Sequence, residues 1–85
     1  MTESNTKNGN GERLGTLRAR EIHSALRRMR FDVVGSAGDK YVMKHEKDGR
    51  TIRVKSERSV QINKRLLGSM LRDANIDVQE FLAHL

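Results

Sequence analysis

The hydrophobic positions near the start of the chain recur with the period of a helix. Within residues 17–30, Ile22, Ala25, Leu26 and Met29 lie three or four positions apart, with polar and basic residues between most of them. In an α-helix this spacing collects the apolar side chains on one face. The pattern therefore predicts an amphipathic helix over residues 17–30.

Basic positions in the same segment form a second stripe. Arg20, His23, Arg27 and Arg30 follow the spacing i, i+3, i+7 and i+10, away from the apolar face. A stripe of this kind is usually a solvated surface, and contact with nucleic-acid phosphates is the sharper alternative. His23 has no evident partner on this stripe, so a catalytic role for it is disfavoured.

Three segments in the middle of the chain have the features of short β-strands. They cover residues 31–34, 40–45 and 51–55. The run from Gly35 to Gly38 interrupts the first strand pattern, and the Asp48-Gly49 pair is a recognised hairpin signal between the other two. In the third strand Ile52 and Val54 face one side and polar residues the other, as a sheet with one solvated face requires.

The last third of the chain predicts two further helices. Asn63 suits the N-cap of the first of them, and Asn75 suits the left-handed residue that ends it. The apolar face between them consists of Leu67, Met70, Leu71 and Ala74. Asp77 opens a short last helix that contains Phe81. The order helix, three antiparallel strands, helix and short helix predicts an α+β fold of two layers.

The excess of positive charge lies in the part of the chain that is expected to fold. Residues 1–13 are polar apart from Met1, so we expect a disordered tail, followed by one domain over residues 14–85. Lysine and arginine number 17 against 11 acidic residues, which gives a formal net charge of +6. The tail holds two acids and two bases, so the excess belongs to the domain. A small basic domain attracts polyanions, of which nucleic acid is the commonest.

The sequence also disfavours several other classes of protein. It contains no cysteine, which removes disulfides, thiolate nucleophiles and sulfur metal sites. No apolar stretch approaches the roughly 20 residues that span a bilayer, and the polar N-terminus lacks the apolar segment of a secretory signal. We therefore expect a cytoplasmic protein. No glycine-rich phosphate loop, metal-ligand cluster or Ser-His-Asp arrangement is evident, so we expect no cofactor and no metal.

Several stretches of the domain together match a known pattern. Arg20-Glu21-Ile22 stands in the first helix, Gly38-Asp39 before the second strand, Asp48-Gly49-Arg50 in the hairpin, and residues 67–81 in the closing helices. In this order they resemble the HicA (YcfA-like) toxin family. The resemblance implies an α-β-β-β-α fold similar to a double-stranded RNA-binding domain. It also implies metal-independent cleavage of messenger RNA and inhibition by a HicB-type antitoxin protein.

The chain departs from this family at the residue on which cleavage depends. The family has a histidine after the Gly-Asp pair, where this chain has Lys40. The family's Val-Pro-x-His feature reads Val54-Lys55-Ser56-Glu57 here, and Arg65 replaces a usual glycine. An ordinary lysine, with a pKa of about 10.4, is charged at neutral pH. It can stabilise a phosphate but cannot accept the ribose 2′-OH proton. We therefore expect Lys40 to mark an inactive catalytic position.

The other histidines are not expected to replace the missing one. His45 lies five positions from Lys40 along a strand, which puts the two side chains on opposite faces, so a structural role is expected. His84 lies close to the C-terminus and is a still weaker candidate.

RNA binding tolerates these replacements better than cleavage does. Basic residues at the sheet edge, at the start of the second long helix and on the first helix are expected to grip phosphates. The expected RNA-binding residues are Lys40, Arg53, Lys55, Arg58, Lys64, Arg65, Arg20, His23 and Arg27. Three classes of function stay open. They are an RNA-cleaving toxin in which Lys40 is natural or engineered, a relative that binds RNA without cutting it, and a non-catalytic module or inhibitor. The last would dock on RNA or on a nucleic-acid-handling protein complex.

Overall fold

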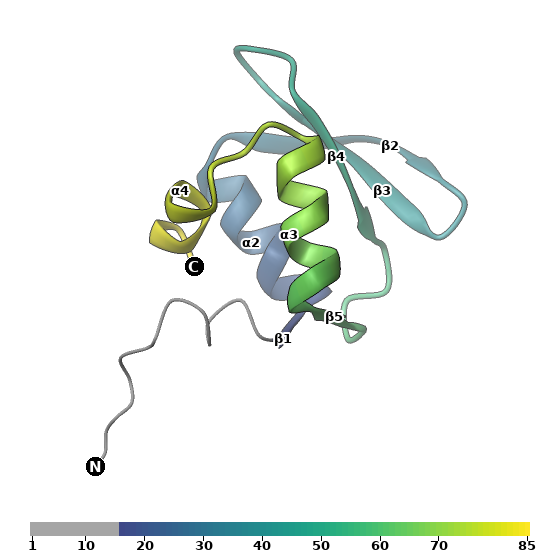
Figure 1. Ribbon diagram of the computed structural model, residues 1–85. Helices are drawn as coiled ribbons and strands as arrows, with labels where there is room; N and C mark the ends of the chain where they lie inside the picture. Colours follow the sequence, from purple (N-terminus) through teal and green to yellow (C-terminus); the bar gives the residue numbers. More distant parts are fainter. Residues whose placement is uncertain (1–15) are drawn as a thin grey trace.

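Helices cover one face of a three-stranded antiparallel sheet in the computed structural model (Figure 1). The structure describes residues 16–85, so the tail expected over residues 1–13 lies outside the described residues. In chain order the elements are β1 (Thr16–Arg18), α2 (Ala19–Arg28), β2 (Phe31–Ala37), β3 (Lys40–His45), β4 (Thr51–Lys55), β5 (Gln61–Asn63), α3 (Lys64–Asp73) and α4 (Val78–Ala83). The predicted α+β class is confirmed.

The first helix is shorter than the sequence predicts. In place of a helix over residues 17–30, α2 covers Ala19–Arg28 and follows the strand β1. Leu17 is buried because it lies opposite Ile62 in the pairing of β1 with β5, and not because it continues the helical face. At the other end Arg30 adopts a left-handed conformation, with φ of 73°, and so lies outside the helix.

The first strand of the sheet is longer than the predicted residues 31–34. The pairing of β2 with β3 shifts its register between Val33 and Gly35, which is a β-bulge, and then continues to Ala37 opposite Lys40. The bulge absorbs one residue and lets the strand run through the glycine. The chain turns only at Gly38, whose φ of 61° suits glycine.

The second and third strands of the sheet have the predicted bounds. β3 and β4 are antiparallel neighbours, and Gly49 in the turn between them has a φ of 80°. Ile52 and Val54 are buried, while Thr51 and Arg53 are exposed. The predicted division of β4 into a core side and a solvated side is therefore confirmed.

The connection before the second long helix contains a strand that sequence reasoning missed. The residues expected to form a polar connection include β5, which pairs antiparallel with β1 and buries Ile62. The helix signals that follow are confirmed. The Asn63 side chain accepts a hydrogen bond from the Leu66 amide at 2.9 Å, and Asn75 has a φ of 61°. Asp77 caps α4 by accepting a bond from the Gln79 amide at 3.3 Å.

One apolar core joins the sheet to the helices. It is built from both helical and strand residues, as the expected amphipathic elements require. Its largest fully buried side chains are Phe31, Phe81, Ile22, Leu26, Met43, Leu67, Leu71 and Val54. Burial of the two phenylalanines leaves Tyr41 as the third aromatic residue, and its side chain is only partly buried.

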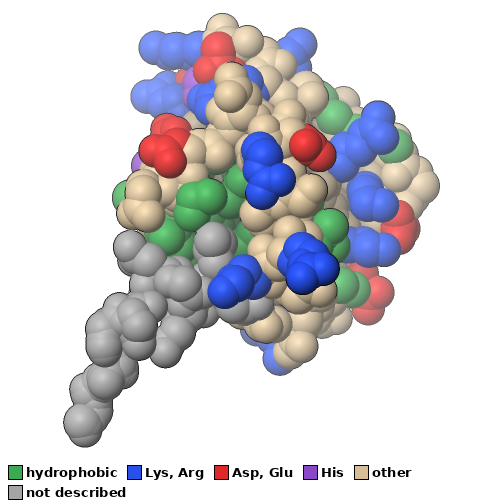
Figure 2. All heavy atoms as spheres, viewed as in Figure 1, with side chains coloured by type: hydrophobic (Ala, Val, Ile, Leu, Met, Phe, Trp, Pro, Cys, Tyr) green, Lys and Arg blue, Asp and Glu red, His purple; other side chains and the backbone are tan. Residues whose placement is uncertain are grey.

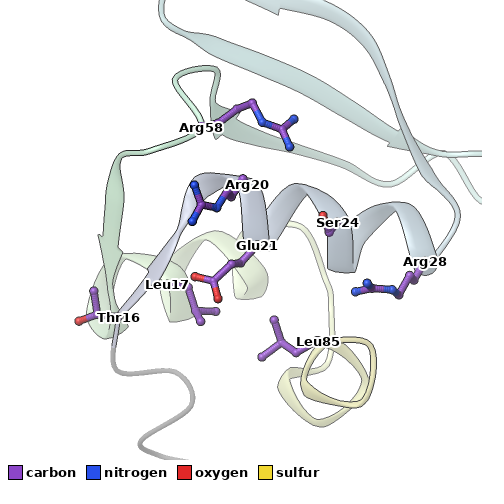
Figure 3. A pocket seen from close by; sticks show the side chains of 8 residues that line it. All are labelled: Thr16, Leu17, Arg20, Glu21, Ser24, Arg28, Arg58 and Leu85. Atoms are coloured by element: carbon purple, nitrogen blue, oxygen red, sulfur yellow. The ribbon is translucent and has the colours of Figure 1, made fainter.

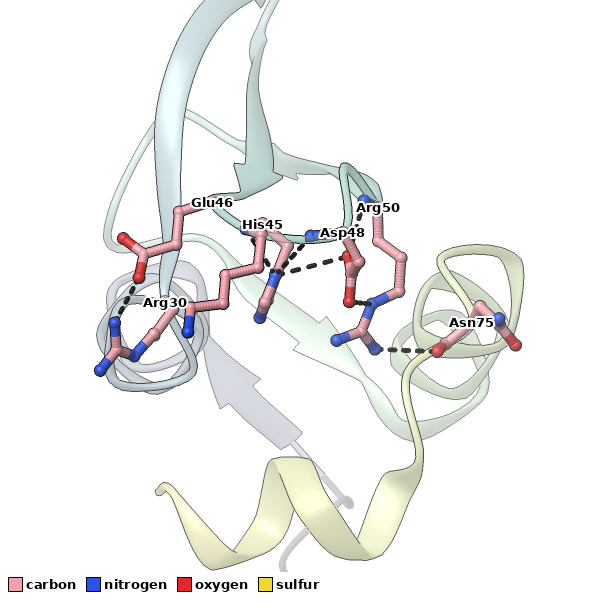
Figure 4. Close-up of polar contacts among 7 residues, drawn as sticks. Arg30, His45, Glu46, Asp48, Arg50 and Asn75 are labelled. Atoms are coloured by element: carbon pink, nitrogen blue, oxygen red, sulfur yellow. Dashed lines mark hydrogen bonds and ion pairs between the residues drawn. The ribbon is translucent and has the colours of Figure 1, made fainter.

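A polar network ties the β3–β4 hairpin to the turn between α3 and α4 (Figure 4). The Arg50 side chain donates to the Asp48 carboxylate at 2.9 Å and to the Asn75 carbonyl at 3.0 Å. The hydrogen bonds from Arg50 hold the pKa of Asp48 below its ordinary value. His45 Nδ1 accepts bonds from the backbone amides of Lys47 and Asp48, both at 3.2 Å. Its ring also contacts the edge of Phe31, which supports the structural role expected for His45.

Candidate nucleic-acid interface

Lys40 and Lys55 lie opposite one another at the end of the β3–β4 ladder. Asp39 lies between them. Its carboxylate accepts a hydrogen bond from Lys55 Nζ and is 3.6 Å from Lys40 Nζ. The bond from Lys55, followed by the charges of Lys40 and Lys55, holds the pKa of Asp39 below its ordinary value. Lys40 and Lys55, both expected to bind phosphate, therefore share the carboxylate of Asp39.

Two hydrogen bonds from Ser56 fix the position of Asp39 and its neighbour Lys40. The Ser56 amide donates to the Asp39 carbonyl at 2.9 Å, and the Ser56 hydroxyl donates to the same oxygen at 3.0 Å. These bonds join the turn between β2 and β3 to the end of β4. Lys40 therefore begins β3 at a defined position, with its side chain 45% exposed and open to an approaching anion.

His23 does not lie on an exposed cationic stripe, so that expectation is wrong. The residue is 5% exposed, its Nε2 lies 3.0 Å from the Lys55 carbonyl oxygen, and its ring lies 5.6 Å from that of Tyr41. On a helical wheel His23 is about 60° from the exposed Arg20 and equally far from the buried Leu26. The spacing alone therefore did not decide whether its side chain is exposed or buried. Burial lowers the pKa of His23, opposed by its bond to Lys55 and reinforced by the charges of Arg58 and Arg27.

Arg30 also leaves the expected stripe. It lies beyond the end of α2 and forms an ion pair with Glu46 (Figure 4). The hydrogen bond from Arg30 holds the pKa of Glu46 below its ordinary value. Of the four residues on the predicted stripe, Arg20 and Arg27 remain exposed on α2.

Arg20 and Arg58 line the same groove on the outer side of α2 (Figure 3). The groove has a volume of about 630 Å³. The Arg20 amide donates to the Arg58 carbonyl at 3.0 Å, which holds the loop after β4 against the start of the helix. Arg28 also lines the groove, and its guanidinium donates to the His84 carbonyl at 2.9 Å. Sequence reasoning missed Arg28, which lies seven positions after Glu21, another lining residue, and so on nearly the same side of the helix.

The contact between His23 and the Lys55 carbonyl connects the basic residues of α2 with those of the sheet. The charges of Arg27 and Arg58 both act on His23, whose ring contacts the backbone of Lys55. Lys55 in turn reaches Asp39 and, through it, Lys40. Lys55 therefore connects Arg27 and Arg58, whose charges act on His23, with Lys40, which shares the Asp39 carboxylate. We call these four lysine and arginine residues the hairpin-end cluster.

The remaining expected residues extend the basic surface beyond this cluster. Arg53 lies on the exposed side of β4, two residues before Lys55, while Lys64 and Arg65 are exposed in the first turn of α3. Within residues 16–85, no acidic side chain forms an ion pair with any of these three. Figure 2 shows basic side chains over α3 and along the side of the molecule where the β-strands lie.

None of the histidines in the described residues is placed to act as the proton acceptor that Lys40 replaces. His23 is buried against the Lys55 carbonyl, and His45 is bound within the hairpin turn. His84 Nδ1 lies 2.9 Å from the Glu80 carbonyl at the other end of the chain. Across residues 16–85 no group of three or more His, Cys, Asp or Glu side chains could hold a metal ion. None of the helices in this part of the chain is long and apolar enough to cross a membrane.

No family model matches the chain, and no curated protein matches it. The resemblance to the HicA family therefore stays a prediction carried by the residues quoted above.

Proposed function

We propose that this protein binds structured RNA through phosphate contacts, as a diverged relative of the HicA-type toxins. The observation that carries the proposal is the hairpin-end cluster, in which Lys40 and Lys55 share Asp39 and Lys55 contacts His23, on which the charges of Arg27 and Arg58 act. Convergence of cations from separate elements creates a positive potential that a scattered surface charge does not. Phosphate oxygens are the groups that such a surface attracts.

The recognition we propose depends on shape and charge and not on base stacking. Phe31 and Phe81 are fully buried, and Tyr41 packs against His23. The described surface thus offers no row of aromatic rings on which successive bases could stack. Double-stranded RNA is commonly bound through its phosphates and 2′-hydroxyls, with little reading of sequence. A structured RNA therefore fits this surface better than an unpaired strand.

We further propose that the protein binds RNA but does not cleave it. Metal-free cleavage needs a group that removes the ribose 2′-OH proton, and a histidine suits this task because it titrates near neutral pH. Lys40 occupies that position and lies in an ion pair with Asp39. A protonated amine can stabilise a phosphate but cannot take up a proton. The messenger-RNA interferase, or endoribonuclease, activity of the family is therefore not part of the function proposed for this chain as it stands.

A HicB-type antitoxin and a cytoplasmic location belong to the same proposal. Both follow from the resemblance to the toxin-antitoxin family. The gene beside this one provides the direct test. A neighbouring HicB-like protein that co-purifies with this chain would support the toxin lineage, and an unrelated neighbour would favour a repurposed binding module.

RNA binding is tested by fluorescence anisotropy with a labelled RNA hairpin of about 16 base pairs, the span of a double-stranded RNA-binding domain. With about five phosphate contacts, affinity should fall by roughly two to three orders of magnitude between 50 and 200 mM salt. Affinity that stays flat over this range would contradict an electrostatic grip.

Asp39 supplies a sharper test of where the RNA binds. Asp39→Asn removes the carboxylate that Lys40 and Lys55 share, so it should tighten RNA binding. Asp32→Asn is the matched control, because it makes the same charge change at the far end of the sheet, opposite Lys44. Equal effects of the two substitutions would show that net charge matters and that the hairpin-end cluster is not the binding site.

Cleavage is tested by restoring the residue type that the family resemblance implies. Lys40→His should give RNA cleavage in vitro, or growth arrest on expression, if the rest of the site can still work. Wild-type protein and Lys40→Gln serve as controls that lack an imidazole. Cleavage by the wild-type protein would overturn the proposal that binding alone remains.

A further inference from the structure

The strand β4 forms one edge of the three-stranded sheet, whose order is β2-β3-β4. Backbone bonds continue the β3–β4 ladder at both ends, from His45 to Arg50 at 2.8 Å and from Ser56 to Asp39 at 2.9 Å. Backbone groups alternate in direction along an antiparallel strand. The amides and carbonyls of Ile52 and Val54 therefore point toward β3, and those of the residues between and beside them point away from the sheet.

Two of these outward-facing residues lack a backbone partner within the described chain. The Lys55 carbonyl contacts His23, but no hydrogen bond within residues 16–85 reaches the outward-facing backbone groups of Thr51 or Arg53. Both residues are exposed. An unpaired row of amides and carbonyls is a template for another strand.

A groove of about 450 Å³ lies beside this edge and is lined by residues of β4 and of the helix α3. Figure 1 shows α3 next to β4. Its lining consists of Lys40, Thr51, Ile52, Arg53, Met70, Asp73 and Ala74. Met70 is partly exposed, and Leu66, one helical turn earlier, is 47% exposed. The helix side of the groove thus consists of the apolar flank of Met70 and Ala74 next to the Asp73 carboxylate, while Lys40 and Arg53 contribute two positive charges on the strand side.

We propose that the β4 edge binds an extended, acidic segment of a partner protein as a fourth strand of the sheet. Main-chain hydrogen bonds to Thr51 and Arg53 would supply affinity, as in other cases of strand addition. Successive side chains of an added strand point to opposite faces. One set meets Lys40 and Arg53, which favour carboxylates, and the other meets the apolar flank at Met70. This interaction does not depend on RNA binding.

A second copy of the chain is a poorer occupant of the same edge. Antiparallel pairing of β4 with itself along its whole length places Arg53 opposite Arg53 and Lys55 opposite Thr51. Like charges directly opposite one another destabilise a strand pair. Charge complementarity therefore favours an acidic partner segment over a homodimer.

The proposal is tested with a labelled peptide of alternating glutamate and valine. Binding is measured by anisotropy, and its location by the amide NMR signals of Thr51 and Arg53, which should shift. A peptide of the same sequence with alternate backbone nitrogens methylated keeps every charge but cannot complete the ladder. It should bind at least about tenfold more weakly, as expected for the loss of a typical hydrogen bond. Equal binding of the two peptides would overturn strand addition.

Two substitutions at one exposed position complete the test. Thr51→Pro removes the outward-facing amide and keeps all charges, and an edge strand can accommodate a proline at such a position. It should weaken peptide binding by about tenfold, as expected for the loss of one ladder hydrogen bond, whereas Thr51→Val should retain it. A concentration-dependent dimer that Thr51→Pro dissociates would instead show a second copy on this edge and overturn the partner proposal.

The peptide and RNA interactions are separable by experiment. Thr51→Pro should leave RNA affinity unchanged, because it alters no charge. The pair Lys64→Gln and Arg65→Gln should weaken RNA binding and leave peptide binding intact, since both residues lie at the opposite end of α3 from Asp73 and Ala74. Loss of peptide binding in this pair would show nonspecific attraction to positive charge and contradict edge recognition.

Discussion

The buried contact between His23 and the end of β4 makes a prediction about stability. His23→Leu keeps an apolar side chain in the same space but leaves the Lys55 carbonyl without the partner that now lies 3.0 Å away. Loss of one partner of a buried hydrogen bond costs about 1–3 kcal/mol. We place His23→Leu near the lower end, at about 1 kcal/mol, because the contact is only partly buried. For a domain of this size that change lowers Tm by about 4–8 °C.

The same histidine should make the effect depend on pH. Burial lowers its pKa from the ordinary value of 6.5, so the folded protein takes up a proton less readily than the unfolded chain. Well above pH 6.5 the ring is neutral in both states and its contribution to stability is complete. As the pH falls below 6.5, the unfolded chain becomes protonated first and the folded state loses stability, by about 1.4 kcal/mol for each unit of pKa difference.

Urea unfolding of the wild-type protein and of His23→Leu between about pH 8 and pH 5 measures both effects. The variant should be less stable at pH 8, and the difference should shrink as the pH falls, because only the wild-type protein has a histidine to protonate at this position. His84→Gln is the control, since it removes a histidine at the partly exposed C-terminal end and should leave the pH dependence of the wild type intact. A difference between wild type and His23→Leu that stays constant over this range would refute the reasoning.

Two further predictions concern local backbone geometry. Asn63→Ala removes the side-chain acceptor of the Leu66 amide at the start of α3 and should lower the free energy of unfolding by about 1 kcal/mol, measured by urea unfolding. Asn63→Asp keeps an acceptor at this position and should retain most of the wild-type stability. Gly49→Ala should cost about 1–2 kcal/mol, because φ is 80° there. The added methyl would meet only an ordinary contact with Lys44, so Gly49→Asn, which tolerates a left-handed conformation, should be less destabilising than Gly49→Ala.

The sequence was informative where the structure is determined by neighbouring residues. The bounds of β3 and β4 follow from their alternation and from the turn at Gly49, and the caps at Asn63 and Asp77 act on amides two or three residues away. Each of these signals is complete within a few positions. They predict the element and its end together.

The features that the sequence did not predict depend on contacts between distant segments. Thr16–Arg18 becomes a strand because Gln61–Asn63 lies beside it, and neither segment alternates over enough residues to predict a strand by itself. The strand β2 continues past Gly35 because β3 supplies its partners. His23 is buried by the end of β4, which its position on the helix could not reveal. In each case tertiary contacts override the local pattern.

The candidate site shows the same limit, and it changes how position 40 is understood. In the sequence Lys40 is a lysine where the family has a histidine, but the strand register places it opposite Lys55, with Asp39 between the two amines. Asp39 is exposed, so solvent screens its attraction for both lysines and an incoming phosphate can compete with it. Arg53 has no such competitor within residues 16–85. If RNA binds at this end, a phosphate must displace Asp39 from Lys40 and Lys55, whereas a phosphate can bind Arg53 without breaking an ion pair among the described residues. For that reason the Asp39 carboxylate, more than the lysine that replaces the histidine, should set how tightly this end of the domain binds phosphate.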